Sequence, residues 1–407
     1  MPLVDLGAYA EEFDADPYPF YAALREAGPV HRAMIGGDLS WLVVGHDEAR
    51  QALNHPALSK DWLGSDLFDS TAHAANVNML ETDPPHHTRL RRLVAREFTP
   101  RRVEALRPRV QQVTDELLDA MAARPDRRAD LIRAFAAPLP MTVICELLGV
   151  PDLDQERFRF WSAEIVTPLN PVGPDPRALE RMTAYLRELV EAKAKDPGED
   201  LLSALIRTLP QEPADAAGPQ VADGDRLSPD ELIGMAFLLL VAGHETTVNL
   251  IGNGVRALLA HPGQLAALRA DPDGLIDGAV EEMLRYDGPV QHATYRFART
   301  DLEISGTRIE AGSSVLVALA AANRDPERFA EPAPETFDIR RTGQSHLAFG
   351  HGIHFCLGAP LARMEGRIAI RSLLERFPDL AEDPDAGPRD WLPGTLMRGV
   401  RTLPLRW

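Results

Sequence analysis

Cys356 is the residue whose surroundings in the sequence most strongly indicate a reactive or metal-binding side chain. Glycines occupy positions 350, 352 and 358 around it, and a helical pattern of apolar residues begins at Ala359. A thiolate near a helix N-terminus is stabilised by backbone N–H groups and by the helix dipole, so Cys356 is suited to be an electron-rich metal ligand. Two other interpretations stay open. One is a buried, unreactive cysteine on a glycine-rich turn. The other is a zinc site with His351 and His354, although no second Cys or His pair nearby gives the usual zinc spacing.

A second polar group follows the apolar run at 232–243. His244 and Glu245 begin like the zinc-protease motif His-Glu-x-x-His, but position 248 is Val, which excludes that motif. A threonine in the middle of a helix, such as Thr246, commonly returns its hydroxyl to the carbonyl four residues earlier. Beside a reactive centre, the same hydroxyl and the Glu245 carboxylate would instead carry protons.

Glu282 and Arg285 form a third pair of interest. They are three residues apart and share one face of a predicted helix. An exposed pair with this spacing is usually a solvated ion pair worth a few tenths of a kcal/mol. Spacing alone therefore predicts little for this pair.

These motifs resemble those of the cytochrome P450 family, the haem-thiolate monooxygenases. Four segments match in the family's order, namely residues 83–91, 242–247, 282–285 and 349–358. The resemblance extends from about Asp16 to Trp407 and so covers essentially the whole chain. It implies a single, mainly α-helical domain over residues 1–407, which is the cytochrome P450 fold, a helical prism with a small β-rich region.

The resemblance also implies roles for individual residues. Cys356 would be the axial thiolate ligand of haem b, with other residues of its loop and one of the central helix around the cofactor: Phe349, Gly350, Gly358 and Ala242. The two haem propionates need cationic hydrogen-bond donors when buried, and the residues at the matching positions are His87, Arg91, Arg296 and His354. Glu245 and Thr246 would deliver protons. Glu282 and Arg285 would be a buried structural pair that helps to hold the cysteine loop.

The implied activity is hydroxylation or epoxidation of a hydrophobic small molecule, using O₂ and two electrons. The chain has neither a G-x-G-x-x-G dinucleotide motif nor an iron–sulfur cysteine set, so the electrons would come from a separate ferredoxin and its reductase. A basic patch for that partner is predicted at six arginines: Arg89, Arg92, Arg101, Arg102, Arg363 and Arg367. Two alternatives are a haem-thiolate sensor without turnover, which would not need the Glu245 and Thr246 pair, and a peroxide-driven enzyme, which would replace it.

Within the family, residues 60–62, 78–81, 241–250 and 403–407 resemble actinobacterial macrolide hydroxylases of the pikromycin type. A macrolide or another secondary metabolite is therefore the predicted substrate. Its pocket is expected to be lined by apolar residues, namely Leu80, Val241, Ala242, Val290, Leu396 and Met397. Glu81 resembles the carboxylate that binds the amino sugar, although a neighbouring carboxylate of that pattern is replaced by Ala72. Residues 62–80 and 158–184 differ most from the pattern, so the sequence does not identify the substrate.

The elements that must position these residues are mostly helical. Apolar residues recur every three or four positions in 101–149 and 179–208. Ser228, Pro229 and Glu231 are typical of a capped helix start. With no proline until Pro262, the helix would run some 30 residues, about 45 Å. Short extended pieces, too few for a large sheet, are expected at 30–33, 41–44, 302–304 and 314–319, and loops at 167–177 and 210–225.

Composition narrows the class of protein. The 407 residues include 61 acidic and 43 basic side chains, a net charge of −18, which argues against nucleic acid as the main partner. The apolar run at 232–243 is shorter than the roughly 20 residues of a membrane span. The two cysteines, Cys145 and Cys356, indicate a reducing compartment, and the N-terminus has no signal-peptide pattern. We therefore expect a cytoplasmic monomer that does not bind membranes.

Overall fold

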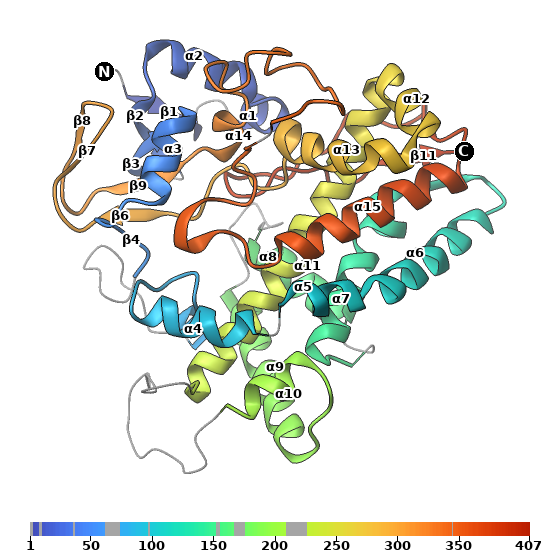
Figure 1. Cartoon of the computed structure of the whole chain (residues 1–407), viewed down its shortest axis with the longest axis horizontal. Coiled ribbons are helices and arrows are strands. Elements are labelled where there is room, and N and C mark those ends of the chain that lie inside the picture. Colours follow the sequence, from blue (N-terminus) through green and yellow to red (C-terminus); the bar gives the residue numbers. More distant parts are fainter. Residues whose placement is uncertain are drawn as a thin grey trace. The chain divides into compact units, whose positions relative to one another are not determined.

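Helices make up most of the protein, as the apolar periodicity predicts. The computed structural model describes residues 3–7, 10–35, 37–61, 74–96, 98–151, 155–166, 176–208, 226–343 and 345–407. Figure 1 shows the helices, which are α1 (Ala10–Ala15), α2 (Tyr18–Ala27), α3 (His46–Leu53), α4 (His86–Ala95), α5 (Pro100–Ala105), α6 (Arg107–Ala122), α7 (Pro138–Leu148), α8 (Gln155–Val166), α9 (Pro176–Lys195), α10 (Leu201–Ile206), α11 (Pro229–Ala260), α12 (Pro262–Ala270), α13 (Pro272–Asp287), α14 (Leu319–Ala322) and α15 (Ala359–Arg376).

The strands are short and form three sheets. They are β1 (Val4–Asp5), β2 (Val30–Ile35), β3 (Asp38–Val43), β4 (Leu58–Ser59), β5 (Arg128–Asp130), β6 (Arg296–Ala298), β7 (Leu302–Ile304), β8 (Thr307–Ile309), β9 (Ser314–Val317), β10 (Ala381–Glu382) and β11 (Pro404–Arg406). The largest sheet has the order β1-β2-β3-β9-β6-β4, the second has the order β10-β11-β5, and β7 pairs with β8. The β-rich region is small, as expected, although its main sheet has more strands than the sequence indicates. Its outer strands are too short to give an alternating pattern.

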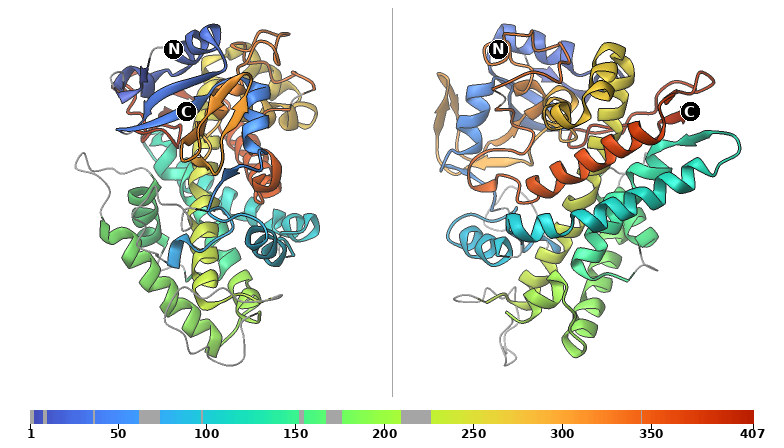
Figure 2. Two further views of the ribbon diagram at one scale, coloured as in Figure 1. Left: turned by 90° about the vertical axis from the view of Figure 1, so that its left-hand side faces the viewer. Right: turned by 45° about the vertical axis from the view of Figure 1, so that its right-hand side comes forward.

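The described residues form two compact units. The first comprises residues 1–58, 108–139 and 246–407 and contains all three sheets. In it, β2 and β3 form an antiparallel hairpin in which Val30 faces Val43, and β3 continues parallel to β9. The two faces of this sheet bury separate apolar clusters, one with α3 and one with α2. Figure 2 shows the sheet in two further views, with the β7 and β8 hairpin at its edge.

The second unit comprises residues 59–107 and 140–245 and is helical. Helices α8 and α9 pack through aromatic side chains, since the ring of Phe158 meets that of Tyr185 edge-on with centroids 4.8 Å apart. Asp200 caps α10 by accepting a hydrogen bond from the backbone N–H of Ser203 at 2.8 Å. The prediction of helix over 179–208 is therefore confirmed except at the break between α9 and α10, where Pro197 and Gly198 interrupt it.

Helix α11 begins where the sequence predicts and has 32 residues. The backbone N–H of Glu231 donates to Ser228 Oγ at 3.1 Å, and the N–H of Ser228 donates to the Glu231 carboxylate at 2.7 Å, so the capping box is confirmed. By length and composition alone α11 is apolar enough to cross a membrane. However, 67% of its most apolar stretch is buried within the protein, which is typical of a core helix.

The helical prediction over 101–149 is wrong at one place. Between α6 and α7 the chain forms β5, which pairs antiparallel with β11 near the C-terminus. This strand depends on a partner more than 270 positions away in sequence, and a local periodicity cannot reveal such a partner. The predicted loop at 210–225 and most of the one at 167–177 lie outside the described residues.

Candidate active site

The cysteine loop in the first unit is shaped by its glycines and by backbone hydrogen bonds. The N–H of Cys356 donates to the carbonyl of Phe349 at 2.9 Å, which closes the loop. Gly350 and Gly352 have φ values of 72° and 73°, in the left-handed region that side chains disfavour. A Cβ at Gly352 would also lie 2.8 Å from Asn54 Oδ1. Gly358 then caps α15 without a side-chain acceptor, so the first N–H groups of α15 are not capped by it.

The thiol at this helix start is exposed. Cys356 is classed as exposed, and its neighbour Phe355 is a large apolar side chain that is 41% exposed. Cys145, in contrast, is fully buried. The interpretation as a buried, inert cysteine therefore applies to Cys145 and fails for Cys356. An exposed thiol beside an exposed aromatic ring fits a large, apolar, metal-containing group such as haem.

Glu282 and Arg285 are fully buried, which excludes the solvated interpretation. Arg285 donates twice to the Glu282 carboxylate, at 2.7 Å in each case. Its remaining N–H groups donate to the backbone carbonyls of Asn323, Pro334 and Thr336. Helix α13 is thereby fixed to the chain that leads into the cysteine loop.

Two further contacts extend this network to the loop. Arg341, which the sequence analysis did not single out, lies 3.3 Å from the Glu282 carboxylate and is also buried. The side-chain oxygen of Asn323 accepts a hydrogen bond from the N–H of Leu347 at 2.6 Å, two residues before Phe349. The start of the cysteine loop is therefore held through Asn323.

Two of the four predicted propionate ligands, His87 and Arg296, are buried, and the other two are half-buried. In the first unit, Arg296 is in β6 and only 4% exposed, and its guanidinium donates to the carbonyl of Thr294 at 3.2 Å. His354 ends the 3₁₀ turn of the cysteine loop. In the second unit, His87 is 2% exposed in α4, and Arg91 lies one turn later on the same helix. His87 and Arg296 are therefore not ordinary surface side chains.

Helix α11 has one face that its neighbours do not fully cover. Among its central residues Ala242 is exposed, and Val241, Glu245 and Thr246 are half-buried. Their spacing places them on one side of the helix. At Gly243, a Cβ would lie 2.8 Å from the Ile144 side chain, so glycine is required where α7 packs against this stretch.

His244 gives Glu245 a partner that the motif alone did not reveal. The Nδ1 atom of His244 lies 2.8 Å from the carbonyl oxygen of Leu240, which can only accept, so Nδ1 carries a proton. The other ring nitrogen, Nε2, lies 3.3 Å from the Glu245 carboxylate. His244 is itself 1% exposed. The predicted proton donor therefore has a buried imidazole beside it.

In the second unit, the segment before α4 is fixed around Asn78. The side-chain oxygen of Asn78 accepts hydrogen bonds from the N–H groups of Leu80 and Glu81, at 2.8 and 3.3 Å. Burial raises the pKa of Glu81 to about 7, and attraction to the Lys60 ammonium partly offsets this rise. Lys60 is only 1% exposed, and such complete burial of a lysine cannot be read from a sequence. Ala72 lies outside the described residues, as does the rest of 62–73.

The three predicted pocket residues of the first unit lie on two segments of chain that pair with each other. Val290 and Met397 form an antiparallel bridge, and the N–H of Gln291 donates to the carbonyl of Leu396 at 2.9 Å. Leu80, Val241 and Ala242 belong to the second unit. The apolar character of all six positions fits a hydrophobic ligand.

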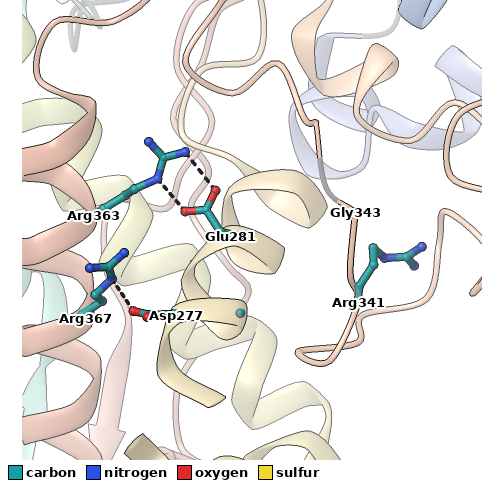
Figure 3. A pocket seen from close by; sticks show the side chains of 7 residues that line it. Asp277, Glu281, Arg341, Gly343, Arg363 and Arg367 are labelled. Atoms are coloured by element: carbon teal, nitrogen blue, oxygen red, sulfur yellow. Dashed lines mark hydrogen bonds and ion pairs between the residues drawn. The ribbon is translucent and has the colours of Figure 1, made fainter. Parts of the chain in front are cut away.

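The six predicted redox-partner arginines differ in their exposure and in their partners. Arg92, Arg101 and Arg102 are exposed. Arg89 is mostly buried and pairs with Glu231. Arg363 and Arg367 line a surface pocket of about 490 Å³ between α13 and α15 (Figure 3). There Arg363 binds Glu281 through two of its nitrogens, and Arg367 binds Asp277.

The positive charge of Arg363 is balanced by the carboxylate of Glu281, with which it pairs. Burial alone would raise the pKa of Glu281, but hydrogen bonds from Arg363 and His346 lower it to about 2. The carboxylate therefore stays charged near neutral pH. The guanidinium of Arg363 also lies over the ring of Phe349, 4.4 Å from its centroid. The guanidinium of Arg363 thus has two local partners, the Glu281 carboxylate and the Phe349 ring.

Comparison with known proteins identifies relatives over the whole chain. The cytochrome P450 family model matches residues 10–403. The cytochrome P450 monooxygenase PikC of Streptomyces venezuelae is 58% identical, over 100% of this chain and 94% of its own. The 6-deoxyerythronolide B hydroxylase of Saccharopolyspora erythraea is 45% identical, over 98% and 97%. The tirandamycin C-bound P450 monooxygenase TamI superimposes with a TM-score of 0.87 at 44% identity, covering 99% of each chain. The predicted fold is confirmed.

Replacing Arg285 by Leu should destabilise the protein by about 3–5 kcal/mol, because it leaves the buried Glu282 carboxylate without its main partner. The free energy of unfolding, measured by urea denaturation, checks this value. Arg308→Leu is the matched control, since Arg308 of β8 and its partner Asp301 are both exposed and the loss of this pair should hardly matter. Similar destabilisation by both variants would contradict the structural role of the buried pair.

Proposed function

Because the chain belongs to the cytochrome P450 family and is a haem-thiolate monooxygenase, we propose that it hydroxylates or epoxidises a macrolide or a related hydrophobic secondary metabolite at a haem bound by Cys356. The observation that carries the site is the exposed thiol of Cys356 at the N-terminus of α15. The substrate class is supported by the relatives, since one is named for hydroxylating 6-deoxyerythronolide B and another binds tirandamycin C. Because a relative is named for its hydroxylase activity, the alternative of a haem-thiolate sensor without turnover is disfavoured for this chain.

Haem, when bound, supplies an iron that accepts electrons and activates O₂. The chain's own residues hold it and shield it. Cys356 provides the thiolate, which the N–H groups at the start of α15 stabilise. The glycine-rich turns beside Phe349 and the small side chain of Ala242 leave room for a flat group. The four cationic side chains at the predicted positions bind the propionates by charge-assisted hydrogen bonds, namely His87, Arg91, Arg296 and His354.

Glu245 and Thr246 supply the protons that the reaction consumes. Thr246 lies on the uncovered face of α11, and a hydroxyl can both donate and accept a hydrogen bond. The Glu245 carboxylate is half-buried on the same face, so solvent can reach it. The imidazole of His244 beside Glu245 provides a second group that can hold a proton. A peroxide-driven enzyme would not need this acid and threonine.

The substrate is held by apolar walls and, where it carries an amine, by Glu81. The walls in the first unit are Val290, Leu396 and Met397, and those in the second unit are Leu80, Val241 and Ala242. The Glu81 carboxylate lies at the end of a segment that Asn78 makes rigid. An ammonium group on an amino sugar would gain a partly desolvated ion pair there.

Electrons are delivered by a ferredoxin, itself reduced by a ferredoxin reductase. The exposed arginines of α4 and α5, which are Arg92, Arg101 and Arg102, provide positive charge on an otherwise acidic protein. Complementary charge of this kind accelerates the encounter with an acidic partner. We expect the enzyme to act as a cytoplasmic monomer.

Thr246→Ala should leave the spectrum and the substrate affinity of the haem-loaded enzyme nearly unchanged, while the product formed per electron falls several-fold. Electrons would still be consumed, but protons would arrive without the hydroxyl that directs them, so hydrogen peroxide or water would be released instead. Electron consumption, product and hydrogen peroxide are measured together, with a macrolide that the wild-type enzyme oxidises. Thr247→Ala is the control, because Thr247 is buried on another side of α11. Unchanged coupling in Thr246→Ala would make Thr246 a structural residue.

Glu81→Gln should weaken binding of an amino-sugar macrolide by about 1–3 kcal/mol, the value of a hydrogen bond to a charged group, and hardly affect the neutral aglycone. Since the pKa of Glu81 is about 7, the carboxylate is charged above that pH and neutral below it. The affinity of the wild-type enzyme for the amine should therefore fall as the pH drops through about 7, and that of Glu81→Gln should not.

Lys60→Met provides a check on this assignment. Removing the cation that lowers the pKa of Glu81 should move the pH midpoint of amine binding upward. Both ligands are titrated by the substrate-induced shift of the Soret band at pH values on both sides of the pKa of about 7. Equal weakening of amine and aglycone by Glu81→Gln would end the anchor assignment.

Arg102→Glu should slow reduction by an acidic ferredoxin at low ionic strength and flatten the salt dependence of that rate. Stopped-flow reduction of the haem is the measurement. Arg102 is a cleaner test than Arg363, whose reversal would also repel Glu281. Arg308→Glu changes the net charge equally on the exposed β7 and β8 hairpin and serves as the control. Identical rates for Arg102→Glu and wild type at low salt would remove α5 from the partner surface.

A further inference from the structure

Three of the proposed wall residues lie on two strips of chain that pair with each other in the first unit. The N–H of Arg398 donates to the carbonyl of Pro289 at 2.8 Å, and the N–H of Gln291 donates to the carbonyl of Leu396 at 2.9 Å. Val290 and Met397 form the bridge between these bonds. We call residues 289–292 and 395–398 the wall ladder. A ladder this short has few backbone bonds, so its position depends on what holds its two ends.

One end of the wall ladder is held by a buried histidine. His292 Nδ1 lies 2.5 Å from the carbonyl oxygen of Thr395, and His292 Nε2 lies 3.0 Å from the hydroxyl of Tyr21 in α2. A carbonyl can only accept, so Nδ1 carries the proton. Burial lowers the pKa of His292 to about 4, which keeps the ring neutral and leaves Nε2 as an acceptor.

Tyr21 must therefore donate to His292. Burial raises the pKa of Tyr21 well above its ordinary value, so the hydroxyl retains its proton. The Tyr21 hydroxyl therefore donates to His292 Nε2, and His292 Nδ1 donates to the carbonyl of Thr395, the residue before Leu396. The ring of Phe13 packs against both partners, stacked on His292 and edge-on to Tyr21, with centroids 6.5 and 5.5 Å away. This apolar cover excludes water that would compete for Nε2.

The other end of the wall ladder is held by Arg398, the residue after Met397. Its guanidinium pairs with the buried carboxylate of Asp287 at 3.1 Å and donates to the carbonyls of Asp14 and Ala15, the latter at 3.0 Å. Tyr21 thus contacts His292, which in turn binds the residue before Leu396. Asp14 and Ala15 contact Arg398, the residue after Met397. The side chains of Tyr21, His292 and Arg398 are buried, whereas the carbonyls of Asp14 and Ala15 lie nearer the surface.

We propose that Tyr21, His292 and Arg398 are positioning residues that set the place of the Leu396 and Met397 wall, so that the N-terminal segment 13–21 determines which bulky ligands the site accepts. This inference rests on the proposed function, in which Leu396 and Met397 line the substrate pocket. None of the three side chains needs to touch the substrate. Their effect is on the backbone from which the wall side chains project.

Tyr21→Phe removes the hydroxyl that contacts His292 and also the side chain of Gln291, both in the wall ladder, and it keeps the ring that packs on Phe13. The haem-loaded full chain is titrated with imidazole, a small ligand, and with clotrimazole, a bulky apolar one. Clotrimazole binding, followed by the Soret shift, should weaken about fivefold to tenfold, as expected for one buried hydrogen bond. Imidazole binding and the reduced, CO-bound spectrum should not change.

Thr114→Val is the matched control. Thr114 is buried in α6 of the same unit and donates to the carbonyl of Val110 at 2.7 Å, so the variant loses one buried hydroxyl elsewhere. It should leave the ratio of the two azole affinities at the wild-type value. Arg398→Lys keeps a charge beside Asp287 but loses the forked donation to Asp14 and Ala15, and it should reproduce the selective loss of clotrimazole binding.

Leu396→Ala separates this inference from the function on which it rests. If Leu396→Ala changes clotrimazole binding while Tyr21→Phe and Arg398→Lys do not, the positioning role is overturned and the wall stands. Equal weakening of imidazole and clotrimazole by both positioning variants would also overturn it, since that is the effect of a general loss of structure. If Leu396→Ala changes neither azole, the wall assignment itself fails and the inference fails with it.

Discussion

The burial of Glu282 against Arg285 is the constraint on which the catalytic side of the first unit depends. Removing two charges from water costs several kcal/mol per ion, and only complete hydrogen bonding compensates for it. Arg285 therefore needs backbone acceptors, and the chain after α14 supplies them at Asn323, Pro334 and Thr336. Because Asn323 also binds the N–H of Leu347, satisfying one buried pair fixes the path of the chain into the cysteine loop.

Several arginines of this acidic protein serve as ligands inside the fold. Arg285 and Arg341 bind Glu282, Arg398 binds Asp287 and Arg363 binds Glu281, each in addition to backbone carbonyls or an aromatic face. A planar guanidinium can satisfy several acceptors at once, which an ammonium group cannot. An arginine on a helix near the cysteine loop is thus no guide by itself to a partner surface, and exposure separates Arg102 from Arg363.

The sequence predicted the elements and motifs whose signals are local. The capping box at Ser228, the start of α15 after Cys356 and the spacing of Glu282 and Arg285 all rest on residues within a few positions of each other. It did not predict the burial of Lys60, the role of Asn323 or the strand β5. Each of these depends on a partner that only the folded chain brings near, such as β11 for β5. The site residues were found through a family resemblance, and their surroundings were found through the structure.

Helix α13 carries acidic side chains toward three different parts of the first unit. Glu281 binds Arg363 of α15, Glu282 binds Arg341 of the chain before the cysteine loop, and Asp287 binds Arg398 of the wall ladder. Each residue added to an α-helix turns everything after it by about 100°. Inserting or deleting one residue between positions 282 and 287 would therefore turn Asp287 away from Arg398 while Glu282 stayed in place. The contacts of Glu282 and Asp287 therefore fix the number of residues in this stretch of α13.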